Sequence, residues 1–399
     1  MPTTFYPPYN TGGDAIHVYS LANSLAGMGH QIDIIHCIDS YQFKSKNRQT
    51  KIGYKNHPNI TVYSLKSRVG DLSPVMSYLT GYPFFKRKLA DILQKNTYDL
   101  VHFHGVSFFG VKVFRYGSAP KIHTAHTHFL ICPQTTMLKY GKASCNKKKF
   151  DIHCQICLMR TGKPPQIWRH TKLLEESIKH LGLIIAPSEY LKNKLVSGGI
   201  KSKIAVLPHF VQEPSHVKKE YKKDYFLFVG RTDWYKGLQK IMPLFGNIKA
   251  ELFVIGGEGN YDKQLRVLAS GNKKIRFFGR LDNEYLGKFY KNAIATIIPS
   301  IVPEVFPMVA LESLSYGTPI IVNNVGGLPE IALKSKAGFV FKDDKQLLSA
   351  LNTVKDDNKL RSYLSKNALR AYKKHFSKKA FFKKYFELIE NVKENTAHN

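Results

Sequence analysis

The stretch "AIATIIPSIVPEVFPMVALESLSYGTPIIVNN", residues 293–324, has the pattern of a strand, a helix and a second strand. "AIATIIPS" and "TPIIVNN" are short runs of mostly apolar residues, as in buried parallel strands. Residues 307–316 fit a helix, because proline is favoured at the first helical position, Gly317 suits the helix end and Pro319 prevents its continuation. The stretch therefore predicts one unit of a parallel α/β sheet.

The same alternation of apolar runs and helical periods extends over nearly the whole chain. Because there are too many strands for one open sheet, the sequence predicts an α/β fold of two Rossmann-like domains. The polar, proline-containing segment 208–225 separates the two series. We expect an N-terminal domain over 1–208 with a cysteine-rich insertion at about 130–165, a second domain over 209–375, and a C-terminal helix and tail over 376–399.

The beginning of the chain has a glycine loop that enters a helix, "TGGDAIHVYSLANSLAGMGH" at residues 11–30. A doubly wound domain needs a strand before such a loop, and only "MPTTF" is available. Either this strand is very short or the natural start lies upstream of Met1, and we favour the second alternative.

The charge of the chain is strongly basic. Lys and Arg number 60 against 29 Asp and Glu, which gives a net charge of +31 over 399 residues. Such a field favours anionic partners: phosphorylated substrates, nucleic acid or anionic lipid. No apolar run approaches the roughly 18–20 residues that span a bilayer, and the N-terminus has no secretory pattern. Five cysteines are too few for a disulfide scaffold, so we expect a cytoplasmic protein.

Two carboxylates flank the apolar helix of the opening stretch. Glu304 lies in the loop before the helix, and Glu312 lies within it. Open parallel sheets bind ligands at the carboxyl ends of their strands, and a helix N-terminus at that edge suits phosphate. The two carboxylates could then accept hydrogen bonds from sugar or ribose hydroxyls. Two ordinary acids near a helix start, favoured by its dipole, are the alternative.

Two basic side chains follow another strand, in "YFLFVGRTDWYKGL". Arg231 and Lys236 lie in the loop after that strand, where they could neutralise a departing diphosphate. Alone they carry little weight, because 60 basic residues are available. In "VGGLPEI", Gly326 and Gly327 could let the backbone approach a ligand closely, although a plain turn explains them equally well.

Four of the five cysteines fall within one polar, basic segment: Cys132, Cys145, Cys154 and Cys157. They end in the C-x2-C spacing that is usual for tetrahedral thiolate zinc, and His153 is an alternative ligand. A structural zinc ion could order this insertion, and an iron–sulfur cluster is a less favoured choice. Four reduced or partly oxidised thiols in a loop are the other interpretation.

Together these motifs resemble the retaining glycosyltransferases of family 4, which have the GT-B fold. The resemblance covers nearly the whole chain and is strongest over residues 225–331, where "VGRTDWYKG", "FFGRLDNEYLGKFYKNA", "PSIVPEVFPMVALESLSYGTPII" and "VGGLPE" occur in the family's order. The E-x7-E spacing of Glu304 and Glu312 in this context is specific. The resemblance implies two parallel sheets that face each other across a cleft, and a C-terminal helix that crosses back to the N-terminal domain.

The resemblance also implies roles for the residues that match its motifs. Arg231 and Lys236 would bind the donor diphosphate, Glu304 would contact the transferred sugar and Glu312 would bind the ribose hydroxyls. The family uses nucleotide-diphosphate sugars and needs no catalytic metal. This chain would therefore move a sugar, with retention of configuration, to a glycan or a polyprenyl-linked acceptor in the assembly of cell-surface polysaccharide, glycolipid or protein glycan.

Backbone groups would complete the donor site. In the resemblance, Gly12 and Gly13 form the loop over the diphosphate. Many family members have glycine where this chain has Pro307, which lacks an N–H, so the amides of Met308 and Val309 remain to bind phosphate.

Histidines crowd the remaining site, in "HTAHTHF". His126 matches the family's histidine near the reacting carbon, and its position after a strand favours it over His123 and His128. His104, in "VHFHG", is a supporting candidate. Any one of them taken alone is more often structural than catalytic.

Three basic runs, at 44–51, 84–95 and 145–150, lie in the N-terminal half. The second reads as a helix whose Phe and Leu residues oppose a basic face, and such a helix can lie on an anionic bilayer. Core packing with a solvated basic face is the alternative. Family members commonly extend lipid-linked glycans, so we expect a peripheral protein on the inner face of the cell membrane.

Two other functions fit parts of the sequence. A basic nucleic-acid-binding protein with a zinc module would explain the charge and the cysteines. The sequence has no RRM signature, no C2H2 spacing and no extended basic tail, so we expect no nucleic-acid partner. A sugar-nucleotide epimerase of the GT-B fold is the enzyme alternative. The sequence does not name the donor sugar, its base, the acceptor, the linkage or the oligomeric state.

Overall fold

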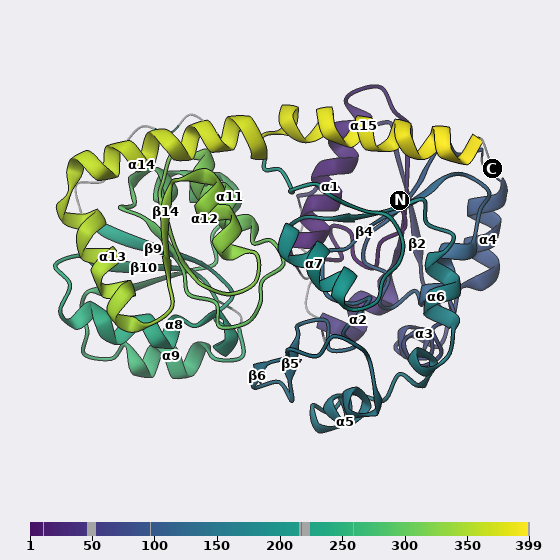
Figure 1. Ribbon diagram of the computed structural model, residues 1–399, viewed down its shortest axis with the longest axis horizontal. Coiled ribbons are helices and arrows are strands. Elements are labelled where there is room, and N and C mark those ends of the chain that lie inside the picture. Colours follow the sequence, from purple (N-terminus) through teal and green to yellow (C-terminus); the bar gives the residue numbers. More distant parts are fainter. Residues whose placement is uncertain are drawn as a thin grey trace. The chain divides into compact units, whose positions relative to one another are not determined.

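The computed structural model describes residues 1–10, 12–45, 53–95, 97–214, 217, 224–257 and 259–397. Two compact units divide the chain: unit 1 comprises Met1–Leu207 and Lys384–Asn399, and unit 2 comprises Pro208–Lys383. Each unit contains parallel β-strands with helices around them (Figure 1). Residues 46–51 of the basic run at 44–51, and residues 215, 216 and 218–223 of the polar segment at 208–225, lie outside the described residues.

Six parallel strands form the sheet of unit 2, in the order β11-β10-β9-β12-β13-β14. Their bounds are β9 (Tyr225–Gly230), β10 (Glu251–Gly256), β11 (Ile275–Gly279), β12 (Thr296–Ile298), β13 (Ile320–Asn323) and β14 (Gly338–Phe341). This is the doubly wound order of dinucleotide-binding sheets, in which the order reverses between the two central strands, here β9 and β12. The apolar runs predicted each of these strands except β14.

Alternate residues of β9 face opposite layers of unit 2. Phe226 and Phe228 pack in a core that includes residues of α8 (Leu238–Ile241), α9 (Asp262–Leu268) and α13 (Asp344–Asp356). Tyr225 and Leu227 pack in a second core with residues of α10 (Asn283–Asn292). Burial on both faces explains why the strand is a continuous apolar run. The other helices of unit 2 are α11 (Met308–Ser315), α12 (Leu328–Ser335) and α14 (Asn358–Ala371).

The opening stretch forms β12, α11 and β13, as predicted. One detail differs: Pro307 is the residue before the helix, with φ −75° and ψ 118°, and the first helical residue is Met308. Its ψ is extended, so Pro307 sets the direction from which the chain enters the helix. Gly317 follows the helix end at φ +73°, a conformation that glycine adopts without steric cost.

Unit 1 has two groups of parallel strands. One is β1-β2, and the other is β3-β4-β7-β8. Their bounds are β1 (Ile32–Cys37), β2 (Ile60–Leu65), β3 (Val101–Phe103), β4 (Lys121–Thr124), β7 (Leu183–Ala186) and β8 (Ile204–Val206). The first residues of the chain join the groups, because Pro2 forms a parallel bridge with Ile35 and its carbonyl accepts from His104 N at 3.0 Å. This segment occupies the place of a very short first strand.

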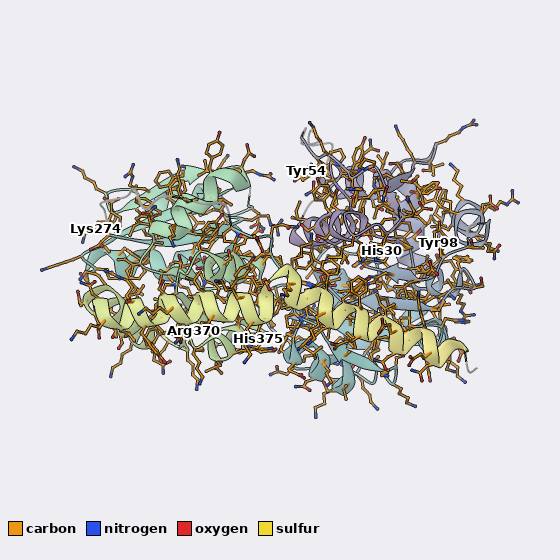
Figure 2. All side chains as sticks on the ribbon, turned by 90° about the horizontal axis from the view of Figure 1, so that it is seen from above. His30, Tyr54, Tyr98, Lys274, Arg370 and His375 are labelled. Atoms are coloured by element: carbon orange, nitrogen blue, oxygen red, sulfur yellow. The ribbon has the colours of Figure 1, made fainter. Side chains whose placement is uncertain are left out.

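The helices of unit 1 are α1 (Gly13–Ala26), α2 (Ile38–Ser45), α3 (Leu72–Thr80), α4 (Lys86–Lys95), α5 (Ile152–Arg160), α6 (Leu173–Ile178) and α7 (Glu189–Ser197). Residues from Lys384 onward of α15 (Lys378–Ala397) also belong to unit 1. His30, labelled in Figure 2, lies against this part of α15, with its ring 5.8 Å from that of Phe386. Within the described residues, no helix is long and apolar enough to cross a membrane.

The helix predicted over 84–95 forms as α4, but the leucines of its apolar side are not available to a bilayer. Leu89 and Leu93 are only 0% and 4% exposed and belong to the core. The prediction that this face of the helix contacts lipid is therefore wrong. Burying a leucine in the protein stabilises the fold by about 1.5–3 kcal/mol, so the amphipathic pattern reports core packing.

The cysteine-rich insertion has secondary structure and a small core of its own. It contains the hairpin β5 (Leu138–Lys139) and β6 (Ala143–Ser144), followed by α5. Met137, Leu138 and Leu158 are buried. The insertion is therefore ordered by buried apolar side chains of its own, whether or not it binds a metal ion.

Candidate active site

The ion pair between Lys236 and Glu304 lies at the switch point of the unit 2 sheet. Lys236 ends the short 3-10 turn η3 (Trp234–Lys236) after β9, and Glu304 lies in the loop after β12. The Lys236 Nζ to Glu304 Oε1 distance is 2.5 Å, and Ser300 Oγ donates to the same oxygen at 2.7 Å. The Lys236 and Glu304 side chains are 25% and 17% exposed, so both remain partly accessible. This edge is where open α/β sheets bind ligands.

The pair keeps Glu304 ionised. Burial alone would raise the pKa of this carboxyl, but the Lys236 charge and the hydrogen bonds from Lys236 and Ser300 outweigh it, so the pKa is lowered. The site therefore holds a fixed negative charge next to a positive one at neutral pH.

Arg231 is held by two residues that the sequence analysis did not single out, Asp233 and Tyr235. Arg231 Nη2 lies 2.8 Å from Asp233 Oδ2, and the Tyr235 hydroxyl donates to the same oxygen at 2.6 Å. Arg231 also donates to the Tyr235 hydroxyl. Asp233 is 7% exposed and Arg231 is 56% exposed, so a buried acid orients an accessible guanidinium. All three belong to the quoted "VGRTDWYKG". The acid two residues after the arginine was the sequence feature that could have indicated its partner.

Glycines bring the loops of this site together. Gly326 has φ +62°, and a Cβ on it would lie 2.2 Å from the Glu304 carbonyl oxygen. The next residue, Gly327, donates its N–H to that oxygen at 2.7 Å. The paired glycines thus let their turn pack on the backbone of Glu304. Gly237, at φ +78°, likewise allows the turn after Lys236 to contact the Pro299 carbonyl.

Glu312 lies in α11 with a different partner. Its Oε2 accepts from the hydroxyl of the buried Tyr290 at 2.7 Å, and the Tyr290 ring stacks on Tyr316 at 5.8 Å. Burial raises the pKa of Glu312 despite the hydrogen bond from Tyr290. Met308 and Val309 are the first two residues of the same helix, where backbone N–H groups have no intrahelical acceptor. The structure thus pairs Lys236 with Glu304 and places the Tyr290 hydroxyl against Glu312. The sequence did not indicate that Tyr290 is the partner of Glu312.

In unit 1, the histidines near β4 have distinct environments. His123 lies within the strand and its Nδ1 is 3.2 Å from the Phe103 carbonyl. His128 contacts the Thr135 carbonyl at 3.3 Å and the Tyr190 hydroxyl at 3.2 Å. Both are buried, and their contacts are those of structural residues.

His126 follows β4 and is less buried than these neighbours. Its Nε2 lies 3.0 Å from Nδ1 of His104, which is fully buried. Burial lowers the pKa of His126 to about 4, so the ring is neutral at physiological pH. A neutral imidazole can donate one hydrogen bond and accept another.

The glycine loop lies beside His126. Gly12 precedes α1 in an extended conformation, and Gly13 begins the helix; both are exposed. One turn further along α1, the His17 ring contacts that of His126, with 5.7 Å between the centroids. Gly12, Gly13 and His126 therefore lie at one end of unit 1.

The cysteines are all free thiols in the structure. Cys154 and Cys157 lie in α5, and Cys157 Sγ accepts from the Tyr140 N–H at 3.1 Å. Across the described residues, no three His, Cys, Asp or Glu side chains are grouped so that they could hold a metal ion. The zinc site remains a prediction from spacing.

Comparison with known proteins identifies the family. The description "Glycosyltransferase Family 4" matches residues 11–213, and "Glycosyl transferases group 1" matches residues 212–371. The chain belongs to glycosyltransferase family 4. An uncharacterized glycosyltransferase of Methanocaldococcus jannaschii is 28% identical over 393 residues, which cover 94% of this chain and 93% of that one.

Two further proteins are similar to this glycosyltransferase over almost its full length. The O-antigen chain mannosyltransferase C of Escherichia coli is 21% identical, with 98% of this chain and 97% of that one covered. The solved sucrose-phosphate synthase of Thermosynechococcus elongatus has a TM-score of 0.73 at 19% identity, with 98% of each chain covered. These likenesses confirm the predicted GT-B fold class.

Proposed function

We propose that this glycosyltransferase moves a sugar from a nucleotide-diphosphate donor to a glycan or lipid-linked acceptor, with retention of configuration and without a catalytic metal. The observation that carries the proposal is the Lys236–Glu304 pair at the switch point of the unit 2 sheet. A cation for the diphosphate and an anion for sugar hydroxyls stand side by side, at the edge where such sheets bind nucleotides.

The donor diphosphate would be bound by groups of the protein, without a metal ion. Lys236 offers a point charge and Arg231 a planar fork suited to phosphate oxygens. The amides of Met308 and Val309, and those of Gly12 and Gly13, would add neutral donors. These groups would supply the stabilisation of the leaving charge that a divalent cation supplies in other enzymes.

Sugar transfer would proceed on one face of the donor. The bond from the anomeric carbon to the diphosphate oxygen breaks, and the acceptor hydroxyl oxygen forms its new bond on the same face. The acceptor proton moves to the leaving phosphate oxygen, so no side chain needs to act as a general base. Glu304 would hold sugar hydroxyls, Glu312 the ribose hydroxyls, and neutral His126 would hydrogen-bond to the sugar near the reacting carbon.

Nucleotide binding gives the first test. A thermal-shift screen with UDP, GDP, ADP and CMP should reveal one diphosphate that stabilises the protein, by about 2.7 kcal/mol at 100 times its dissociation constant. The Lys236→Met variant should lose most of this shift, while Lys240→Met, an exposed lysine on α8, should retain it. Stabilisation by none of the nucleotides would contradict the proposal.

An assay of the purified protein with a nucleotide sugar distinguishes a transferase from the two alternative functions. A transferase releases nucleoside diphosphate from its donor only as sugar reaches an acceptor or water. An epimerase would change the sugar without releasing it, and a nucleic-acid-binding protein would do neither. The paired charges at a sheet edge favour a small phosphorylated ligand over nucleic acid.

For the acceptor, we propose a lipid-linked glycan on an anionic membrane, reached from the cytoplasm. The similarity to an O-antigen chain mannosyltransferase supports a role in cell-surface polysaccharide. The surface that supports membrane contact is α3 rather than α4. Helix α3 buries Ser73 and Ser77 and leaves Leu72 and Met76 51% and 41% exposed, the reverse of a core-packing helix.

Basic and aromatic residues flank α3 in the sequence. Tyr82 and Phe84, which follow the helix, are 46% and 42% exposed. Lys66 and Arg68 precede it, and the basic first turn of α4 follows. Exposed apolar side chains among cations are the composition of surfaces that bind anionic lipid.

Vesicle flotation tests this surface. The protein should float at low salt with vesicles of phosphatidylglycerol and phosphatidylcholine, and less with phosphatidylcholine alone. Leu72→Ser/Met76→Ser should weaken binding by at least about tenfold, because two apolar side chains no longer enter the lipid. The control is Val267→Ser/Leu268→Ser, which removes two exposed apolar residues from α9. Equal binding by both double variants would refute the assignment of α3.

A further inference from the structure

A connected set of buried side chains lies behind His126, and the motif matches do not account for it. His104 forms a hydrogen bond with His126, in which 3.0 Å separate His104 Nδ1 from His126 Nε2. Its ring also contacts the ring of His102, with 4.0 Å between centroids and a tilt of 35° between the planes. His102 is itself held at both nitrogens, by the Tyr385 hydroxyl at 2.9 Å and by Thr124 Oγ1 at 2.8 Å. The order is Tyr385, His102, His104 and His126.

The backbone at His104 is fixed as well. Its N–H donates to the Pro2 carbonyl at 3.0 Å, and the next residue, Gly105, accepts from Thr4. His102 and His104 are 2% and 0% exposed. The His104 imidazole therefore has one orientation, and its Nδ1 points at Nε2 of His126.

Two neutral rings share one proton in the bond between them. Burial lowers the pKa of both imidazoles, that of His104 most strongly, so neither is an imidazolium at physiological pH. In one arrangement His104 donates from Nδ1, and in the other it accepts there and carries its proton on Nε2. The surroundings of His104 Nε2 decide between these two arrangements.

Nε2 of His104 is buried and has no hydrogen-bond partner anywhere in the part of the chain that the structure describes. A proton on it would be a buried N–H without an acceptor, which costs about 1–3 kcal/mol and is rare in proteins. Placing the proton on Nδ1 makes the bond to His126 and avoids this cost. His126 then accepts at Nε2 and carries its own proton on Nδ1.

We infer that His104 is a positioning residue that holds His126 as the neutral Nδ1–H tautomer, with His102 and Tyr385 fixing the His104 ring. This inference deepens the proposed function and rests on it for the role of His126. A free imidazole in water exchanges its proton between the two nitrogens. In the protein, the one N–H of the neutral His126 ring is assigned to Nδ1, so which of its nitrogens donates and which accepts is set before substrate arrives.

Nitrogen NMR on the full chain with ¹⁵N-labelled histidine tests the tautomer without any activity assay. His126 is assigned by the signal that disappears in His126→Gln. We expect a protonated Nδ1 and an unprotonated Nε2 in the native protein, and a shift of the proton toward Nε2 in His104→Leu. In His128→Leu, which removes a buried imidazole bonded to Thr135 and Tyr190, the His126 tautomer should not change. A proton on Nε2 of His126 in the native protein would overturn the inference.

Kinetics provide the second measurement. His104→Leu should lower kcat about tenfold, with little change in the KM for donor, because the hydrogen bond matters at the reacting sugar. His104→Asn places an amide N–H near the position of Nδ1 and should restore kcat to within about threefold of the native value. Equal losses in the two variants would contradict a positioning role. A protein without transferase activity that still shows the Nδ1–H tautomer would refute the proposed function and leave the His104 assignment intact.

Discussion

Replacing Lys236 by methionine is expected to lower kcat/KM for the donor by about 10²–10³-fold. Lys236 lies at the switch point of the unit 2 sheet, and loss of one group that stabilises developing charge has this order of effect. Methionine keeps the length and much of the volume of the side chain, so the change removes chiefly the charge. Initial rates with the nucleotide sugar found in the thermal-shift screen provide the measurement.

The structure adds a second consequence of this substitution. Glu304 would lose the charge that lowers its pKa, and burial would then raise that pKa. Lys240→Met is the matched control, because Lys240 is exposed on the following helix. If Lys236→Met retained kcat/KM within about threefold of the native value, Lys236 would have no part in stabilising the leaving diphosphate.

Replacing Glu304 by glutamine is expected to lower kcat by about 10²-fold while nucleoside diphosphate binds as tightly as before, or more tightly. The amide oxygen of glutamine can accept the bonds from Lys236 and Ser300, so the shape of the loop is kept. The negative charge beside the transferred sugar is lost, and with it the stabilisation of positive charge at the reacting carbon. Lys236 is at the same time freed from its ion pair for phosphate.

Separate measurements of kcat and of nucleotide affinity make this prediction specific. A variant that transfers sugar at the native rate would remove Glu304 from the reaction. A variant that instead loses nucleotide affinity would show that the pair serves to shape the loop. Glu390→Gln, an exposed position on α15, is the control and should change neither quantity.

The local elements of the fold were predictable because their causes are local. "AIATIIPS" and "TPIIVNN" are buried on both faces, and such strands are apolar without interruption. Pro319 and Gly317 mark the helix end for steric reasons that hold in any protein. β14 was missed because "GFVF" is short and only partly buried, and α4 was assigned to the membrane because a core-facing helix and a lipid-facing helix have the same periodicity.

The sequence predicted which residue types form the candidate site, but it did not predict which of these side chains contact one another. Lys236 and Glu304 are 68 residues apart, and only the switch between β9 and β12 places them 2.5 Å from each other. Likewise, nothing in the sequence around His126 indicates that His104 is its partner, because the two follow the neighbouring strands β3 and β4. Hydrogen bonds of this kind follow from strand order, which depends on contacts over the whole unit.

By itself, then, the sequence determined the α/β class, the positions of most strands and helices, and the residues with chemistry suited to a nucleotide sugar. These follow from periodicity, backbone sterics and the order of the motifs. The tertiary structure alone decided which charges meet, that the Tyr290 hydroxyl donates to Glu312, and which face of each helix is buried. The physical reason is that a pKa, a tautomer and an exposed fraction are properties of a side chain's surroundings, and distant parts of the chain provide them.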